Sequence, residues 1–191
     1  MVEKRLKRVG RFLLQKYFGF EKWHISLLEN RPYAIEVIDF LNNRSNKGVV
    51  AEIGCGLGDI VRNLNFKNKV GLDIEEAVLN ATRFLSHLNN KGGDLKLRCF
   101  DFTKDNLAEK CDAIVMVNWI HNIDPGLLRK RVTELFGNNL KNDGVLIFDV
   151  IENEKYRFNH NVEYLTQDVT GEVNLMGPYQ YGRTIVILKK N

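Results

Sequence analysis

The stretch that most constrains the fold is residues 49–59, which read Val-Val-Ala-Glu-Ile-Gly-Cys-Gly-Leu-Gly-Asp. Its first five residues form a mostly apolar run, which is typical of a strand buried on both faces of a parallel sheet. Glycines follow at 54, 56 and 58, and glycine lets a backbone turn sharply and approach a ligand closely. We expect a helix to begin near Asp59, with its free N–H groups facing that ligand. Such a turn seats a nucleotide-like cofactor in a doubly wound α/β domain, although a tight turn without a ligand is the alternative.

The spacing of the acids around this turn narrows the kind of cofactor. A second predicted strand, residues 70–72, ends at Asp73, where an acid suits the two hydroxyls of a ribose. The glycines run G-x-G-x-G and follow Glu52, which differs from the G-x-G-x-x-G of the dinucleotide fingerprint. In Glu52-Ile-Gly-Cys-Gly-Leu-Gly58 and Gly71-Leu-Asp73-Ile74 the chain resembles the class I S-adenosylmethionine-dependent methyltransferases. The resemblance covers residues 49–150, and it implies methyl transfer with S-adenosylmethionine (SAM) as cofactor.

The resemblance also implies where the parts of SAM would bind. The glycine turn would hold the methionine part and Asp73 the ribose. Asp101 and Phe102, after a third predicted strand, would face the adenine. Asn118 and Trp119, after a fourth strand at residues 113–117, would lie beside the cofactor on the path to the transferred methyl. The expected cofactor residues are Glu52, Gly54, Cys55, Gly56, Gly58, Asp73, Ile74, Asp101, Phe102, Asn118 and Trp119.

The order of the predicted elements indicates one α/β domain of the doubly wound, Rossmann-like class. Helices at residues 75–88 and 127–140 alternate with strands across residues 48–150, which supports a mostly parallel sheet and makes this part the cofactor-binding core. Residues 1–47 read as an N-terminal helical cap segment. In residues 151–191, the stretches 164–169 and 184–188 read as two strands joined through a turn-rich segment. The resemblance implies a seven-stranded sheet in which these strands form an antiparallel hairpin.

The first helix of the cap segment is basic. Residues 1–22 hold seven Lys/Arg and two Glu, a net charge of +5, whereas the whole chain carries +4. Leu6, Val9, Leu13 and Tyr17 recur at three- and four-residue steps, which predicts an amphipathic helix with a Lys/Arg-rich opposite face. Such a helix could lie on an acidic membrane or on RNA. We favour a helix packed on the domain with a solvated basic face, because a nucleic-acid surface calls for interleaved aromatic residues.

Four residues of the cap segment are candidates for contacts to the methyl acceptor. A second helix is predicted to begin at Pro32, because proline suits the first helical position. In the resembling family a segment before the sheet often covers the pocket, which makes Trp23, His24, Arg31 and Tyr33 candidate substrate residues. The alternative is that Trp23 anchors the core and His24 is its exposed neighbour.

His121 is the candidate catalytic residue. It follows the fourth predicted strand, and an imidazole pKa near 6.5 would let it take a hydroxyl proton at neutral pH. The alternative is a structural histidine in the loop before Pro125. The other histidines lie far apart and none pairs at i, i+4, so we expect no metal site.

The remaining composition predicts a cytoplasmic protein. The three cysteines, Cys55, Cys99 and Cys111, lack metal-ligand spacing, and their odd number favours free thiols in a reducing compartment. The alternating charge of the N-terminus is unlike a secretory signal. No apolar run approaches the length that spans a bilayer, so we expect no transmembrane segment.

The absence of several motifs from the sequence narrows the range of possible methyl acceptors. The fourth strand is not followed by Asn-Pro-Pro-Tyr or Asp-Pro-Pro-Tyr, no cysteine is placed for cytosine-C5 chemistry, and no large insertion provides a target-recognition domain. We therefore expect methyl transfer to an O or N atom of a small molecule. The stretches 118–121 and 23–33 are similar to small bacterial methyltransferases associated with cell-surface saccharides, which suggests a saccharide or its precursor. The alternatives are an RNA methyltransferase that uses the basic helix, and a non-catalytic cofactor-binding subunit.

Overall fold

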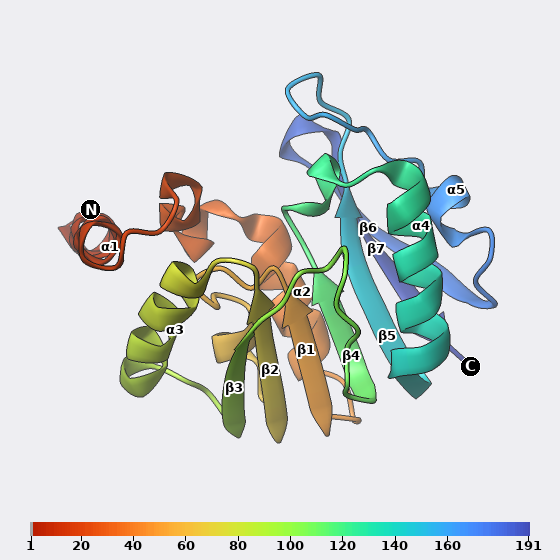
Figure 1. The fold of residues 1–191 in the computed structure, drawn as a ribbon, viewed down its shortest axis with the longest axis horizontal. Helices are drawn as coiled ribbons and strands as arrows, with labels where there is room; N and C mark the ends of the chain where they lie inside the picture. Colours follow the sequence, from red (N-terminus) through yellow and green to blue (C-terminus); the bar gives the residue numbers. More distant parts are fainter. Residues whose placement is uncertain (1) are drawn as a thin grey trace.

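The apolar runs of the sequence form the strands of one seven-stranded sheet in the computed structural model, which describes residues 2–191 (Figure 1). The strand order is β3-β2-β1-β4-β5-β7-β6. Strands β1 to β5 are parallel, β7 is antiparallel to β5, and β6 is antiparallel to β7. The strands are β1 (Val49–Ile53), β2 (Asn68–Asp73), β3 (Asp94–Cys99), β4 (Cys111–Met116), β5 (Leu140–Val150), β6 (Gly171–Tyr179) and β7 (Arg183–Lys190). The predicted fold class is confirmed.

Helices cover both faces of this sheet (Figure 1). On one face α2 (Pro32–Asn42) buries Ala34, Val37 and Leu41 against β1, β4 and β5. On the other face α4 (Pro125–Glu134) and the short α5 (Val162–Thr166) bury Leu128 and Leu165. The helix α3 (Glu76–Leu88) follows β2, and α1 (Val2–Phe18) lies beside α3.

The strand order reverses between β1 and β4, because β2 and β3 extend the sheet one way from β1 while β4 and β5 extend it the other way. The carboxyl ends of β1, β2 and β4 therefore meet at a topological switch point, which is where open α/β sheets bind ligands. The glycine turn follows β1, Asp73 ends β2, and Asn118 comes soon after β4.

The prediction of a helix beginning near Asp59 was wrong. A series of turns and a single 3-10 turn, Val61–Asn63, lead directly to β2. Asp59, Arg62 and the apolar side chains around them are all nearly buried, so this stretch has no solvated face of the kind that an amphipathic helix shows. The short connection from Gly58 to β2 also leaves little room for a helix and a return loop.

The predicted C-terminal hairpin exists, but its first strand was misplaced. Residues 162–166 form α5, in which the Asn161 side chain accepts a hydrogen bond from the Tyr164 backbone N–H at 2.8 Å. Strand β6 begins only at Gly171. It is the edge strand, and most of its side chains are exposed or half-buried, so its sequence lacks the apolar pattern of a buried strand. Helix α4 likewise ends earlier than predicted, at Glu134, and a π-helical turn, Leu135–Asn139, leads into β5.

Helix α1 packs on the domain and exposes its basic residues, as expected, but it does not pack through the predicted apolar face. Its predicted apolar face points to solvent, with Leu6 65%, Val9 49%, Leu13 60% and Tyr17 83% exposed. The opposite face, which includes Leu14 and Phe18, contacts a small cluster built on Phe20, Leu57, Val78 and Ala81. None of the described helices is long and apolar enough to cross a bilayer.

Candidate active site

The glycine turn after β1 adopts backbone angles that other residues rarely take. Gly54, Gly56 and Gly58 have φ values of +72°, +52° and +68°. The N–H of Gly54 donates to the Leu72 carbonyl at 2.7 Å, and the N–H of Gly56 donates to Asp73 Oδ2 at 2.8 Å. Glycine is needed here because positive φ strains residues that carry a Cβ.

Two aromatic side chains cover this turn. A Cβ at Gly54 would lie 2.2 Å from Trp119 Nε1, and a Cβ at Gly56 would lie 2.7 Å from His24 Nδ1. The Trp119 indole donates to the Ile53 carbonyl at 2.6 Å, while His24 stacks on Trp23 with ring centroids 3.5 Å apart. The structure thus brings Trp119 and the adjacent pair Trp23 and His24, which lies far from Trp119 in the sequence, to the glycine turn.

Asp73, the last residue of β2, connects the glycine turn with Glu75 and, through Glu75, with His24. Its carboxylate accepts from the N–H groups of Gly56 and Glu75, and Glu75 Oε2 lies 3.0 Å from His24 Nε2. Burial raises the pKa of Asp73, and burial lowers the pKa of His24 to about 4, despite the nearby charge of Asp73. His24 is therefore a neutral imidazole at pH 7. Ile74 follows Asp73 and is 65% exposed, as an apolar group available to a ligand would be.

The expected adenine residues form a tight local turn. Asp101 Oδ1 accepts from the Thr103 hydroxyl at 2.6 Å and from the Thr103 N–H at 2.9 Å, and Lys104 pairs with the same carboxylate. These hydrogen bonds, with the Lys104 charge, lower the pKa of Asp101 to about 2. Phe102 is buried and packs edge-on against Trp119, with ring centroids 5.0 Å apart. One aromatic contact thus joins the segment after β3 to the Trp119 side chain over the glycine turn.

Glu52 and Cys55 support the turn from within. Glu52 Oε2 accepts from the Val61 N–H at 2.8 Å, and burial raises the pKa of Glu52 to about 8. Burial also raises the pKa of the Cys55 thiol well above its usual value. Neither group carries a charge at pH 7 in most molecules, so both fit a role in shaping the turn.

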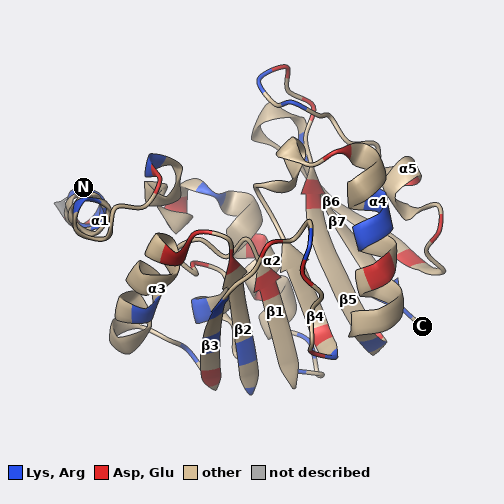
Figure 2. Ribbon diagram, viewed as in Figure 1, with Lys and Arg blue, Asp and Glu red and all other residues tan. Residues whose placement is uncertain are grey.

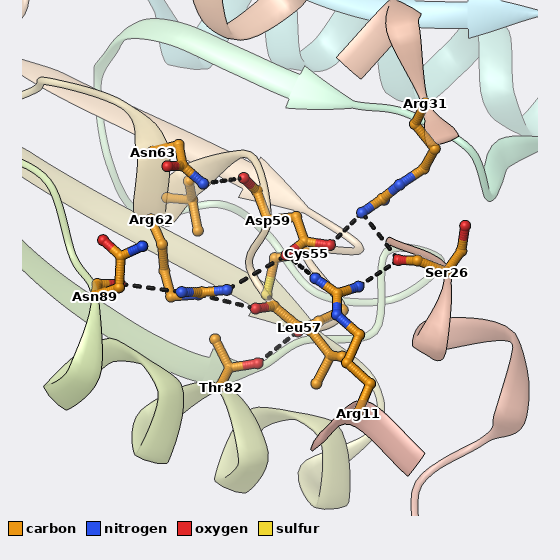
Figure 3. Close-up of polar contacts among 12 residues, drawn as sticks. Arg11, Ser26, Arg31, Cys55, Leu57, Asp59, Arg62, Asn63, Thr82 and Asn89 are labelled. Carbon is orange, nitrogen blue, oxygen red and sulfur yellow. Dashed lines mark hydrogen bonds and ion pairs between the residues drawn. The ribbon is translucent and has the colours of Figure 1, made fainter. Parts of the chain in front are cut away.

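A buried ion cluster beside the turn has no counterpart in the sequence predictions (Figure 3). Asp59 Oδ1 lies 2.6 Å from Arg11 Nη2 and 3.3 Å from Arg62 Nη2, and Asp59 Oδ2 pairs with Arg31. Burial opposes ionisation of Asp59, but the charges of Arg31 and Arg11 hold its pKa below the usual value. One carboxylate thus balances three guanidinium groups, which leaves the cluster net positive. No spacing in the sequence connects residue 11 with residue 59.

A cavity of about 200 Å³ opens next to the turn. We call it the acceptor cavity. Its polar wall includes Tyr33, whose hydroxyl donates to Asn118 Oδ1 at 3.2 Å, and Arg183, whose guanidinium lies 4.6 Å from the Tyr33 ring centroid. Asn118 has a φ of +78°, and such strain clusters at functional sites. The lining residues are Ser26, Asn30, Arg31, Pro32, Tyr33, Asn118, Tyr156, Tyr179, Gln180, Tyr181 and Arg183. Arg31 and Tyr33, which were predicted from the sequence, thus lie together here. Arg183 was not predicted as a site residue, because it reaches the cavity only through β7 near the C-terminal end of the chain.

His121 lies behind this cavity. It is fully buried, and its Nε2 lies 3.1 Å from Asp149 Oδ2, while Nδ1 is buried without a partner among the described residues. Asp149 also accepts from the Asn118 N–H at 2.8 Å and pairs with Arg183. Burial, followed by the Arg183 charge, lowers the pKa of His121 to about 4. His121 therefore faces Asp149 and does not line the acceptor cavity.

The cavity directly over the glycine turn is about 40 Å³. Ligand pockets commonly measure ~300–1,000 Å³, so a nucleoside cofactor has to displace the aromatic cover. The residues otherwise fit SAM: a glycine cradle that a Cβ would fill, an acid at the end of β2 for a ribose, and a net positive cluster for a carboxylate. Among residues 2–191 no three His, Cys, Asp or Glu side chains gather closely enough to hold a metal ion.

Comparison with solved structures shows the same fold in several methyltransferases. Magnesium protoporphyrin IX methyltransferase from Synechocystis PCC 6803 with bound SAM has a TM-score of 0.68 at 14% identity, over 85% of this chain and 80% of that one. An amino pentose methyltransferase from Micromonospora echinaspora, also with bound SAM, has a TM-score of 0.67 at 13% identity, over 94% and 96%. The N-methyltransferase NodS from Bradyrhizobium japonicum WM9 has a TM-score of 0.68 at 16% identity, over 84% and 96%.

Comparison at the level of sequence identifies the family. No curated protein matches the sequence. The family model of the methyltransferase domain matches residues 51–148, about half of the chain, and this range contains the glycine turn, Asp73 and Asn118. The chain therefore belongs to the methyltransferase-domain family, as an enzyme of the SAM-dependent class I type whose cofactor is SAM.

Proposed function

We propose that the enzyme transfers the methyl group of SAM to an O or N atom of a small polar molecule bound in the acceptor cavity. The observation that carries this proposal is that the cavity over the glycine turn and the acceptor cavity share four residues in their walls, which are Ser26, Arg31, Tyr33 and Asn118. A cofactor on the turn and an acceptor in the second cavity would therefore meet across these four residues.

The chemistry of the reaction explains why so few catalytic groups are needed. SAM supplies its own electrophile, a methyl group on a positive sulfur, and the protein binds, orients and excludes water. Asp73 would hold the ribose, and the Arg31 side of the Asp59 cluster would attract the methionine carboxylate. Tyr33 and Asn118, joined by a hydrogen bond, would fix the side of the acceptor that approaches the methyl.

The lining of the acceptor cavity favours a polar acceptor. Tyr33, Tyr156 and Tyr181 offer rings and hydroxyl groups, and Arg183 offers a cation. The volume of about 200 Å³ lies below the ~300 Å³ at which pockets begin to enclose drug-sized ligands. A sugar, or one end of a larger saccharide, matches these features, and one of the structural neighbours is named as an amino pentose methyltransferase.

The general-base role of His121 stays a prediction, and the geometry favours a positioning role instead. His121 contacts Asp149, and Asp149 accepts a hydrogen bond from Asn118 and pairs with Arg183. Through Asp149, a neutral imidazole would keep two residues of the acceptor cavity in place without touching the acceptor. An amine acceptor that arrives unprotonated needs no base for the transfer.

The test is a turnover assay that follows formation of S-adenosylhomocysteine with panels of amino sugars, nucleotide sugars and hydroxy acids, and with total RNA. We expect turnover with a small acceptor, and Tyr33→Phe and Arg183→Met should raise its KM while the Kd of SAM changes little. Turnover with RNA alone would contradict the small-molecule proposal. SAM binding without turnover on any panel would favour the non-catalytic alternative.

A further inference from the structure

The outer face of α1 is apolar and points away from the rest of the protein. Leu6, Val9, Leu13 and Tyr17 follow helical spacing and are 49–83% exposed. The helix is fixed in this orientation, because Arg11 on its inner face is bound to Asp59 and Phe18 contacts Phe84 of α3. Exposing a continuous apolar stripe to water is unfavourable, and such patches mark interaction surfaces.

The helix that carries this stripe is rich in basic residues, and its ribbon shows blue Lys/Arg segments in Figure 2. Lys4, Arg5, Arg8 and Lys16 are exposed and make no ion pair with any described residue. Residues 1–22 carry a net charge of +5, so the other 169 residues carry −1. The positive charge of the protein is therefore concentrated on the element that exposes the apolar stripe.

The apolar surface continues into a groove between α1 and α3. This groove has a volume of about 950 Å³, and its lining includes Leu13 and Leu14 of α1 with Phe84 and Leu88 of α3. Phe84 is 49% and Leu88 is 70% exposed. The groove shares no lining residue with the acceptor cavity, so its apolar surface lies apart from the proposed site of the methyl acceptor.

We propose that α1 is an interfacial helix that binds the surface of an anionic lipid bilayer. A helix with an apolar stripe and flanking Lys/Arg lies in the plane of the interface, with its apolar side chains among the acyl chains and its cations near the anionic headgroups. The stripe and Arg5 and Lys16 match this arrangement, and Phe84 and Leu88 would extend the contact.

Two other occupants fit the surface less well. A second copy of the chain, paired through the same helix, would bring two segments of charge +5 together, and like charges oppose association. RNA would engage the cations, but it stacks on aromatic rings and gains little from Leu6, Val9 and Leu13. An anionic bilayer uses the cations and the aliphatic side chains together.

The experiment is flotation of the full chain with vesicles of phosphatidylcholine alone, or of phosphatidylcholine mixed with phosphatidylglycerol. We expect the mixed vesicles to bind at least about tenfold more tightly, since each Lys/Arg near an anionic surface contributes. Binding should weaken as added salt shortens the Debye length. Leu13→Asp should reduce binding roughly tenfold or more, because it places a carboxylate in the apolar stripe.

Matched controls separate this surface from general effects. Leu175→Asp changes an equally exposed leucine on β6, 58% against 60% for Leu13, and should leave binding unchanged. The triple variant Arg5→Gln, Arg8→Gln, Lys16→Gln should weaken binding, whereas Lys130→Gln, which alters an exposed lysine of α4, should not. The Kd of SAM reports whether each variant is folded and should stay unchanged in all of them.

Three results would overturn the proposal. The first is failure of the mixed vesicles to bind at low salt. The second is an RNA gel shift that the triple variant abolishes and Leu13→Asp leaves intact. The third is a concentration-dependent dimer that Leu13→Asp dissociates, which would assign the stripe to self-association.

Discussion

The indole of Trp119 lies across Gly54, with Nε1 2.2 Å from the position that a Cβ at residue 54 would take. The same Nε1 donates to the Ile53 carbonyl at 2.6 Å, so the ring is held over the turn at which we propose that SAM binds. Binding of SAM at this turn would therefore change the surroundings of Trp119.

Tryptophan fluorescence should detect that change. The chain has two tryptophans, Trp23 and Trp119, so Trp23→Phe leaves Trp119 as the only emitter. We expect titration with S-adenosylhomocysteine to alter its emission in proportion to the binding measured by calorimetry. The matched variant Trp119→Phe retains Trp23, which is 55% exposed, and should respond less. Calorimetric binding with constant Trp119 emission would show that the indole does not move.

Removing the charge of Asp73 should weaken cofactor binding. Asp73→Asn keeps an oxygen acceptor for the Gly56 N–H but loses the charged acceptor for ribose hydroxyls. Hydrogen bonds to charged groups contribute ~1.5–3 kcal/mol, so the Kd of SAM should rise about tenfold to a hundredfold. Asp101→Asn is a useful comparison, because that carboxylate is already engaged by Thr103 and Lys104 and should matter less. A Kd of SAM that is unchanged in folded Asp73→Asn would remove the ribose role.

His121→Gln separates the base role from the positioning role. A general base contributes ~10²–10⁴-fold to turnover and gives a pH step near its pKa. We expect a smaller loss and no such step, because His121 is fully buried against Asp149. Asp149→Asn should raise the KM of the acceptor more than His121→Gln does, since Asp149 contacts Asn118 and Arg183 directly. A loss of hundredfold or more in His121→Gln, with the pH step of the wild type removed, would restore the base role.

Glu52 should make the stability of the protein depend on pH. Its folded-state pKa of about 8 lies above the ordinary value of 4.5, so the folded state holds the proton more tightly than the unfolded chain. Stability should therefore fall as pH rises from about 4.5 to 8, by at most about 1.4 kcal/mol per pH unit. Glu52→Gln cannot titrate at this position. The free energy of unfolding of Glu52→Gln minus that of the wild type, both measured with urea, should therefore increase from pH 4.5 to pH 8. A constant difference between the two proteins from pH 5 to pH 8 would contradict the raised pKa.

The parts of the fold and site that the sequence predicted are those encoded within short stretches. The apolar run of β1, the three glycines and the acid ending β2 each act locally, so spacing alone placed Gly54 and Asp73 at one edge of the sheet. Parallel strands then bring their carboxyl ends together, which explains why Asn118 and Trp119 also belong to this edge.

The remaining features depend on pairings between distant segments. Arg11 reaches Asp59, and Arg183 reaches Asp149, only because the tertiary fold brings these segments together. The periodicity of α1 identified its apolar stripe but not which face contacts the body, and the ion pair of Arg11 decides that. His121 looked like a base because its position after β4 was visible, whereas its burial was not.

Asp59 ties together residues from three parts of the chain. Arg11 belongs to α1, Arg31 precedes α2, and Arg62 lies in the turn ahead of β2, yet all three share one carboxylate. An anion that binds Arg31 at the glycine turn would therefore change the ion pair between Asp59 and Arg11. A displacement of α1 would likewise change the charge balance at the turn. Thermodynamic linkage makes such an effect reciprocal. If a surface bound to α1 changes the affinity of the turn for its ligand by some factor, that ligand changes the affinity of α1 for the surface by the same factor.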